Sequence, residues 1–312
     1  MTASGRLRRG LDRAGSASAD HAVATGFVAA WRLVRLLPEE RARRLFDRLA
    51  TRMYAGDGRG VRTLRENLRR VRPDLDDPAL ERLTEAGVRS YLRYWCESFR
   101  LPSWPMADLV ARTRTVHEER LRAPYDAGRG VVVALPHQAN WDWAGAWACA
   151  TGMPLTTVAE RLRPERLYDQ FVAFRAGLGM TILPLTGGEP PLPALAERLR
   201  AGGFVCLLAD RDLSRSAVEV TLCGHRARMP TGPALLARLT GAALVPATLS
   251  YADRELEIHF HPEVRVGEAA EGVREAMQQV ADAFTAGLRK HPEDWHMMQS
   301  VFSEDLAAGA AG

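Results

Sequence analysis

Short runs of apolar residues alternate with helical patterns through the second half of the chain. Apolar residues return every three to four positions over 166–177 and 191–200, between runs that are too short to be helices. These runs are 131–135, 155–158, 181–183, 204–208 and 244–249. Wholly apolar strands that alternate with helices are typical of parallel sheets covered on both faces. The pattern therefore predicts an α/β fold with a mostly parallel central sheet flanked by helices.

Two later segments complete this predicted core. Residues 255–260 alternate between polar and apolar side chains, which predicts a strand at the edge of the sheet. Residues 273–288 have the period of an amphipathic helix, which we expect to close the domain.

The first third of the chain is predicted to be helical. Arginines are interleaved with apolar residues at helical spacing over 22–49, which predicts two basic amphipathic helices separated at Pro38. Further helices are expected over 61–71 and 78–99, the second capped by the Asp76/Asp77 pair. Basic amphipathic helices either lie on an anionic membrane or bury their apolar side in a core, and the pattern leaves both open.

Neither a repeat nor a long linker divides the chain into independent domains. We expect a disordered polar leader over 1–20 and a disordered Ala/Gly tail over 307–312. Between them we expect a single domain over 21–306, with a helical part at 21–105 and an α/β core at 128–300.

Composition narrows the function classes. The 312 residues include 42 Lys+Arg and 38 Asp+Glu, and the arginines are spread along the chain, so nucleic acid is not an expected partner. The four cysteines form no C-x-x-C pair, and we expect neither a bound metal nor a cofactor. The longest uncharged stretch, 143–159, is interrupted by Gly and Pro and is too short to predict a membrane span.

Polar side chains gather where the predicted strands end. His137 and Asp142 follow the first run, and Asp210 follows the fourth. Because ligands bind at the carboxyl ends of parallel strands, these side chains are candidates for chemistry, although a histidine here can also simply cap the next helix. An imidazole held by a carboxylate can deprotonate a hydroxyl in acyl transfer, with Asp210 or Asp142 as that carboxylate. The sequence lacks a G-x-S-x-G elbow, which favours direct attack by the acceptor hydroxyl.

These residues carry a family resemblance. His137-Gln-Ala-Asn-Trp-Asp142 is similar to the H-x-x-x-x-D/E signature of the bacterial lipid A late-acyltransferase superfamily. Three other segments resemble the branch that acylates phosphatidylinositol mannosides, and the likeness extends from about Glu66 to Trp295. These segments are 210–213, 229–246 and 291–296.

The resemblance implies transfer of a fatty acyl chain from acyl-CoA to a mannose hydroxyl of a phosphatidylinositol mannoside. It implies His137 as general base, Asp210 as its orienting partner and Asp142 as the second acid of the signature. Lipid A enzymes usually have Glu at that fifth position and an N-terminal span. Asp142 and the lack of a predicted span favour the mannoside branch and peripheral attachment to the cytoplasmic face of the cell membrane, at its inner leaflet.

Other polar residues are weaker candidates for substrate binding. Guanidiniums can bind the phosphates of both substrates. Serine hydroxyls can hydrogen-bond the donor, and a carboxylate at a strand end can bind sugar hydroxyls. The candidates are Arg175, Ser216, Glu160, Arg211, Asp212 and Arg228. His259 and His261 are expected on one face of a strand without a third metal ligand, and Trp295 between His291 and His296 either packs inside or contacts lipid headgroups.

Two alternative functions stay open from the sequence. A non-catalytic peripheral lipid-binding protein would use the Arg-rich helices but would not need a base at a strand end. An acyltransferase for another glycolipid, such as a lipid A precursor, would share the histidine motif.

Overall fold

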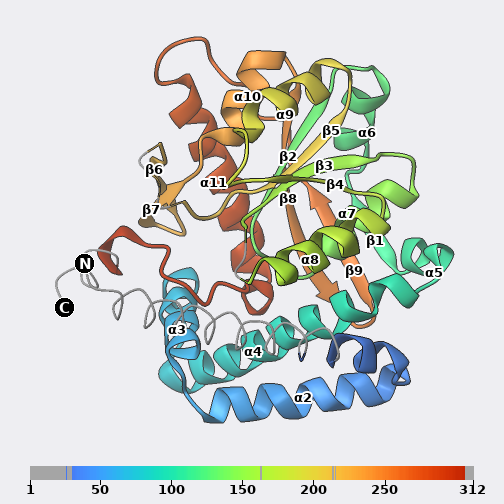
Figure 1. The fold of residues 1–312 in the computed structure, drawn as a ribbon. Coiled ribbons are helices and arrows are strands. Elements are labelled where there is room, and N and C mark those ends of the chain that lie inside the picture. The colour runs from blue at the N-terminus through green and yellow to red at the C-terminus, as the bar shows by residue number, and fades with distance from the viewer. Residues whose placement is uncertain (1–25, 27–29, 162–163, 213, 215, 306–312) are drawn as a thin grey trace, which may run out of the picture.

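The computed structural model describes residues 26, 30–161, 164–212, 214 and 216–305. Within these residues, a central sheet has the strand order β1-β9-β8-β2-β5-β3-β4 (Figure 1). The strands are β1 (Thr113–Val116), β2 (Val131–Leu135), β3 (Leu155–Ala159), β4 (Thr181–Pro184), β5 (Phe204–Leu208), β8 (Ala243–Ala252) and β9 (Glu255–Phe260). The run β8-β2-β5-β3-β4 is parallel throughout, whereas β9 pairs antiparallel with β8 and parallel with β1. The predicted α/β class and mostly parallel sheet are confirmed.

Strand β2 is apolar throughout because both of its faces are buried. Val131, Val133 and Leu135 belong to the core on one face, whereas Val132 and Ala134 belong to the core on the other. The first face is covered by α5 (Met106–Ala111), α6 (Glu119–Asp126), α7 (Trp141–Ala150) and α8 (Glu165–Gly177). The second is covered by α9 (Pro191–Arg200), α10 (Gly232–Thr240) and α11 (Gly272–Lys290).

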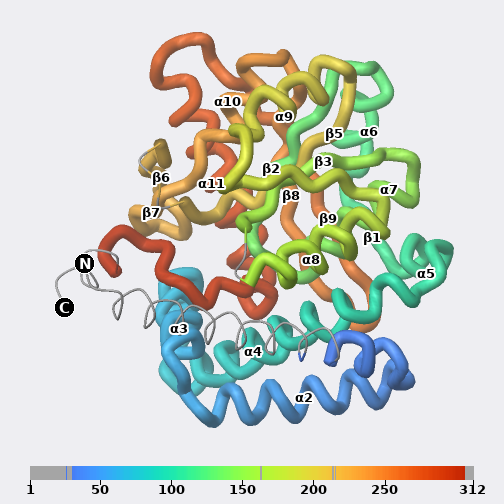
Figure 2. Tube along the Cα trace, viewed as in Figure 1, coloured from blue at the N-terminus to red at the C-terminus, as the bar shows by residue number. Residues whose placement is uncertain are grey.

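The N-terminal helices gather at one end of the molecule (Figure 1). They are α2 (Glu39–Ala55), α3 (Arg59–Val71) and α4 (Asp77–Arg100), preceded by a helical turn over 30–36. Trp31, Phe46 and Phe99 share a core with Val133 of the sheet, so helices and sheet fold around one apolar interior. The C-terminal segment passes beside α3 and α4 (Figure 2), where Asn67 Nδ2 donates to Met297 O at 2.8 Å.

Three details differ from the sequence predictions. Strand β9 does not lie at the edge, because β1 pairs outside it. The sequence did not predict β1 or the small antiparallel hairpin of β6 (Val218–Leu222) and β7 (His225–Met229). These three strands contain no continuous apolar run. The apolar positions of the second predicted N-terminal helix do not form one buried side, because Phe46 is buried whereas Leu45 and Leu49 are exposed.

The predicted leader over 1–20 and tail over 307–312 lie outside the described residues. Among the helices that the structure describes, none is long and apolar enough to cross a bilayer.

Candidate active site

The register of two parallel strands brings His137 and Asp210 together. Leu135 of β2 pairs with Leu208 of β5, and each candidate residue stands two positions further along its strand. His137 Nδ1 lies 2.6 Å from Asp210 Oδ1, and the His137 backbone N–H donates to Asp210 Oδ2 at 2.9 Å. Of the two carboxylates that the sequence left open as a partner for His137, the structure therefore places Asp210 on the imidazole.

Burial and charge act in opposite directions on this pair. Burial alone lowers the pKa of His137, but the Asp210 carboxylate raises it, and the net pKa lies above its usual range. Burial likewise raises the pKa of Asp210, and His137 more than compensates, so the net pKa is lowered. A carboxylate on Nδ1 makes that nitrogen the protonated one in the neutral ring, which leaves the Nε2 lone pair available. Among the described residues no hydrogen bond engages Nε2, and 35% of the side chain is exposed.

The segment 294–296 packs against the His137–Asp210 pair and against the turn that follows β2. His296 N donates to His137 O and Ala139 N donates to Asp294 O, both at 2.8 Å. These bonds hold the turn after β2, in which Ala139 has a positive φ of 46° that costs a non-glycine residue energy. Trp295 is wholly buried and donates its indole N–H to Asp210 Oδ2 at 2.9 Å. Of the two alternatives left open for this segment, packing in the interior is confirmed for Trp295 and His296, and contact with lipid headgroups is excluded for both, because both are buried.

Asp142, the second acid of the motif, has other partners. Its Oδ1 accepts from Arg175 Nε at 2.6 Å and its Oδ2 from the Tyr94 hydroxyl at 2.9 Å, and its side chain is buried. Burial lowers the pKa of Arg175, but the Asp142 charge outweighs this and the net pKa is raised. Arg175 is thus paired with a buried carboxylate, not directed freely towards a phosphate as expected from the sequence. The Trp141 ring stacks on Tyr94 with the ring centroids 4.1 Å apart, and it meets the His137 ring edge-on with the centroids 5.4 Å apart. Because Asp142 holds Tyr94, the Asp142–Arg175 ion pair also supports the Trp141 ring beside His137.

The remaining substrate-binding candidates lie in two loops and, for Arg228, in strand β7. In the loop after β5, Ser214 Oγ bonds both Asp212 Oδ2 and Ser216 Oγ at 2.9 Å, and Arg228 Nη2 donates to Ser214 O at 2.9 Å. Arg211 Nε donates to Ser300 O at 3.0 Å. Glu160, after β3, is exposed. The structure therefore brings Arg211, Asp212, Ser216 and Arg228 into the neighbourhood that follows Asp210 along the chain.

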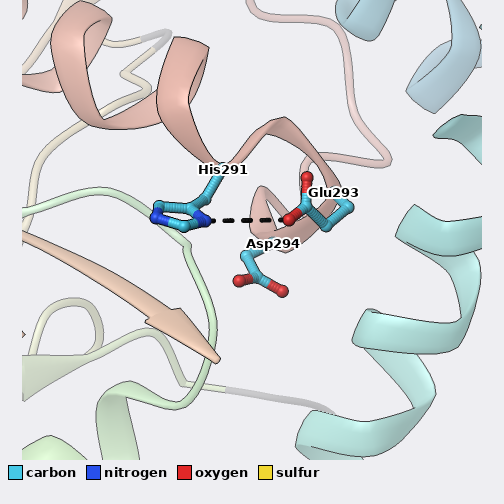
Figure 3. A group of neighbouring side chains, drawn as sticks. All are labelled: His291, Glu293 and Asp294. Atoms are coloured by element: carbon cyan, nitrogen blue, oxygen red, sulfur yellow. Dashed lines mark ion pairs between the residues drawn. The ribbon is translucent and has the colours of Figure 1, made fainter. Parts of the chain in front are cut away.

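Among the described residues, no other histidine side chain bonds His137 or Asp210. His259 and His261 stack with centroids 4.6 Å apart, which confirms that they share a face. Within the described residues, the group whose ligand atoms lie close enough for a metal ion is His291, Glu293 and Asp294 (Figure 3). Asp294 is buried and already accepts from Ser90 Oγ at 2.6 Å and Tyr251 N at 2.8 Å. These bonds tie the closing segment to α4 and β8.

A narrow apolar cavity lies beside the base, between α7 and the sheet. Trp141, which touches the His137 ring, lines it together with Gly145, Trp147, Phe204, Cys206 and Phe260. Burial raises the pKa of the Cys206 thiol to about 12, so this thiol is not a nucleophile at neutral pH. The volume of the cavity is about 30 Å³, which is room for little more than a water molecule, so its apolar lining is part of the packed core and does not hold a fatty acyl chain as it stands.

Comparison with known proteins identifies the family of this chain. The model of the bacterial lipid A biosynthesis acyltransferase family matches residues 19–304. A phosphatidylinositol mannoside acyltransferase of Mycolicibacterium smegmatis is 44% identical over 285 residues, which cover 90% of this chain and 92% of that protein. Proteins of the same name from two Mycobacterium tuberculosis strains, CDC 1551 and H37Rv, are each 43% identical over 284 residues. These residues cover 90% of this chain and 89% of each of those proteins. The chain belongs to this acyltransferase family.

Family membership confirms the resemblance read from the histidine motif and its companion segments. Sequence reasoning about the acyltransferase missed the Tyr94–Asp142–Arg175 cluster and the Trp295 contact to Asp210. The sequence did contain a signal for the contact between His137 and Asp210. The runs 131–135 and 204–208 have equal length, and each is followed two residues later by one of these polar side chains.

Replacing Asp142 by Asn should destabilise this acyltransferase strongly. The variant leaves the Arg175 cation, whose side chain is only 17% exposed, without its buried counter-charge, and breaking a buried pair in this way typically costs about 3–5 kcal/mol. The free energy of unfolding in urea measures the loss. Asp169→Asn, at an exposed position of the same helix as Arg175, is the control. Equal stability of the two variants would contradict the assigned role of Asp142.

Proposed function

We propose that the chain transfers a fatty acyl group from acyl-CoA to a mannose hydroxyl of a phosphatidylinositol mannoside, with His137 as general base. The observation that carries the proposal is the His137–Asp210 pair, whose imidazole keeps Nε2 without a hydrogen bond among the described residues and is 35% exposed. The acceptor is inferred from the names of relatives that are 43–44% identical over most of their length.

In the proposed reaction, the acceptor hydroxyl gives its proton to His137 Nε2 while its oxygen attacks the thioester carbonyl. Asp210 keeps the proton on Nδ1 and stabilises the imidazolium that forms. When the tetrahedral intermediate collapses, the C–S bond breaks and the imidazolium protonates the leaving thiolate. The products are the acylated mannoside and free CoA, and the imidazole is neutral again.

Direct attack is favoured over an acyl-enzyme. Burial raises the pKa of the Cys206 thiol to about 12, so this cysteine is a poor nucleophile at neutral pH. The polar loop after Asp210 is the proposed contact for the polar parts of the substrates, through Arg211, Asp212, Ser216 and Arg228, and exposed Glu160 is the proposed contact for sugar hydroxyls.

Peripheral attachment to the inner leaflet is proposed from the N-terminal helices. Leu33, Leu36, Leu45 and Leu49 are exposed, by 39–80%, and exposed arginines accompany them. On α2, Arg41, Leu45, Arg48 and Arg52 recur three to four positions apart and so share one face. Leucines that insert and arginines that attract anionic headgroups together suit a membrane surface.

The two rival functions fit less well. A non-catalytic lipid-binding protein gives no reason for a buried carboxylate that holds an imidazole with one nitrogen free. A lipid A precursor would require a different acceptor from the one in the relatives' names.

His137→Ala should lower the rate of transfer at least about a hundredfold, because a positioned base contributes that much or more. The measurement is release of CoA thiol from palmitoyl-CoA, with and without phosphatidylinositol mannoside. His117→Ala, which removes an exposed histidine, should behave as wild type. Full acceptor-stimulated release by a folded His137→Ala variant would refute the base.

The double variant Leu45→Asp/Leu49→Asp should bind vesicles containing phosphatidylinositol at least about tenfold more weakly than wild type, since two apolar contacts are replaced by anions. Co-sedimentation measures binding, which should also weaken as salt rises. Leu239→Asp, at an equally exposed leucine of α10, is the control. Equal binding by all three proteins would exclude this surface.

A further inference from the structure

Three donors fix the Asp210 carboxylate. Oδ1 faces His137 Nδ1, while Oδ2 accepts from the His137 backbone N–H and from Trp295 Nε1, each at 2.9 Å. Asp210 has no exposed surface, so water does not supply these bonds. Among the described side chains, Trp295 is the donor to Asp210 that does not belong to the base itself.

Trp295 is itself held from both sides. It forms an isolated antiparallel bridge with Gln138, directly after His137, and its neighbours Asp294 and His296 bond the backbone of the same turn. The Asp294 carboxylate is tied to Ser90 of α4 and to the backbone of Tyr251 of β8. The indole therefore approaches Asp210 from a segment fixed to three parts of the fold.

We propose that Trp295 is a positioning residue, whose indole N–H holds the Asp210 carboxylate in the plane and orientation that His137 requires. The inference rests on the proposed function of His137 as the base. Packing alone would not need a donor here, since phenylalanine fills much of the same space. A buried charged oxygen does need one, because each acceptor left without a donor is costly.

Losing the donor changes the base in a defined direction. The indole N–H withdraws negative charge from Oδ2, so without it the carboxylate acts more strongly on the imidazolium. The pKa of His137, already raised by Asp210, then rises further, and a higher pH is needed to obtain the neutral base. Asp210→Asn removes the charge itself and moves the pKa of His137 in the opposite direction.

Trp295→Phe should reduce kcat about ten- to a hundredfold, as expected for a lost hydrogen bond to a charged group, with KM for palmitoyl-CoA nearly unchanged. The acid limb of kcat/KM should move up by about half a pH unit or more, whereas in Asp210→Asn it should move down. Trp143→Phe is the matched control, because that indole is also wholly buried and donates to Thr113 Oγ1 at 2.9 Å, away from the base. A Trp295→Phe limb that coincides with that of Trp143→Phe would overturn the proposal.

A second measurement uses the wild-type protein and does not depend on the variant folding. The ¹⁵N-labelled Trp295 indole resonance should shift with pH at the same midpoint as the His137 ring protons, while the Trp143 indole resonance stays still. A Trp295 resonance that is constant through the His137 titration would refute the role. This titration needs no turnover, so absence of acyl transfer would refute the proposed function and still leave Trp295 tested.

Discussion

A carboxylate without access to water stands at the end of β5, and much of the structure follows from the need to satisfy its charge. Asp210 is surrounded by the base, by the backbone of the turn after β2 and by the indole of Trp295. Parallel pairing in register places the first two, because His137 and Asp210 stand at equal distances beyond paired leucines. The third requires the chain to return from α11 and lay residues 294–296 along that turn.

The second buried ion pair joins the N-terminal helices to the same site. Asp142 of α7 binds Arg175 of α8 and Tyr94 of α4, and Tyr94 in turn supports the Trp141 ring beside His137. Ser90, one turn earlier in α4, binds Asp294 of the closing segment. Helix α4 therefore supports the site in two places, at the Trp141 ring and at the closing segment 294–296. This explains why the helical part and the sheet share one apolar core instead of forming separate units.

Sequence periodicity located the elements whose environment is uniform. Strand 204–208 and helix 191–200 were predicted with the bounds that the structure has, because one is buried on both faces and the other has one clean apolar side. Strand 113–116 was missed because its TRTV sequence is half-exposed and derives its pairing from β9. The histidine motif was found, yet the residues alone left both Asp142 and Asp210 open as the carboxylate partner of His137. The two acids are distinguished by their partners in the folded chain. Arg175 lies 33 positions from Asp142, and Trp295 lies 85 positions from Asp210. A local sequence pattern cannot predict contacts over such separations.

The proposed base has to satisfy two opposed demands. The imidazole must be neutral to take a proton from a hydroxyl, and it must be basic enough for that transfer to help. A bare buried carboxylate on Nδ1 strengthens the base but also keeps it protonated to higher pH. Asp210 raises the pKa of His137, and two donors to Asp210, the His137 backbone N–H and the Trp295 indole, limit how far it does so. A fully hydrogen-bonded carboxylate thus orients the ring while moderating its charge, which is the compromise that a base working near neutral pH requires.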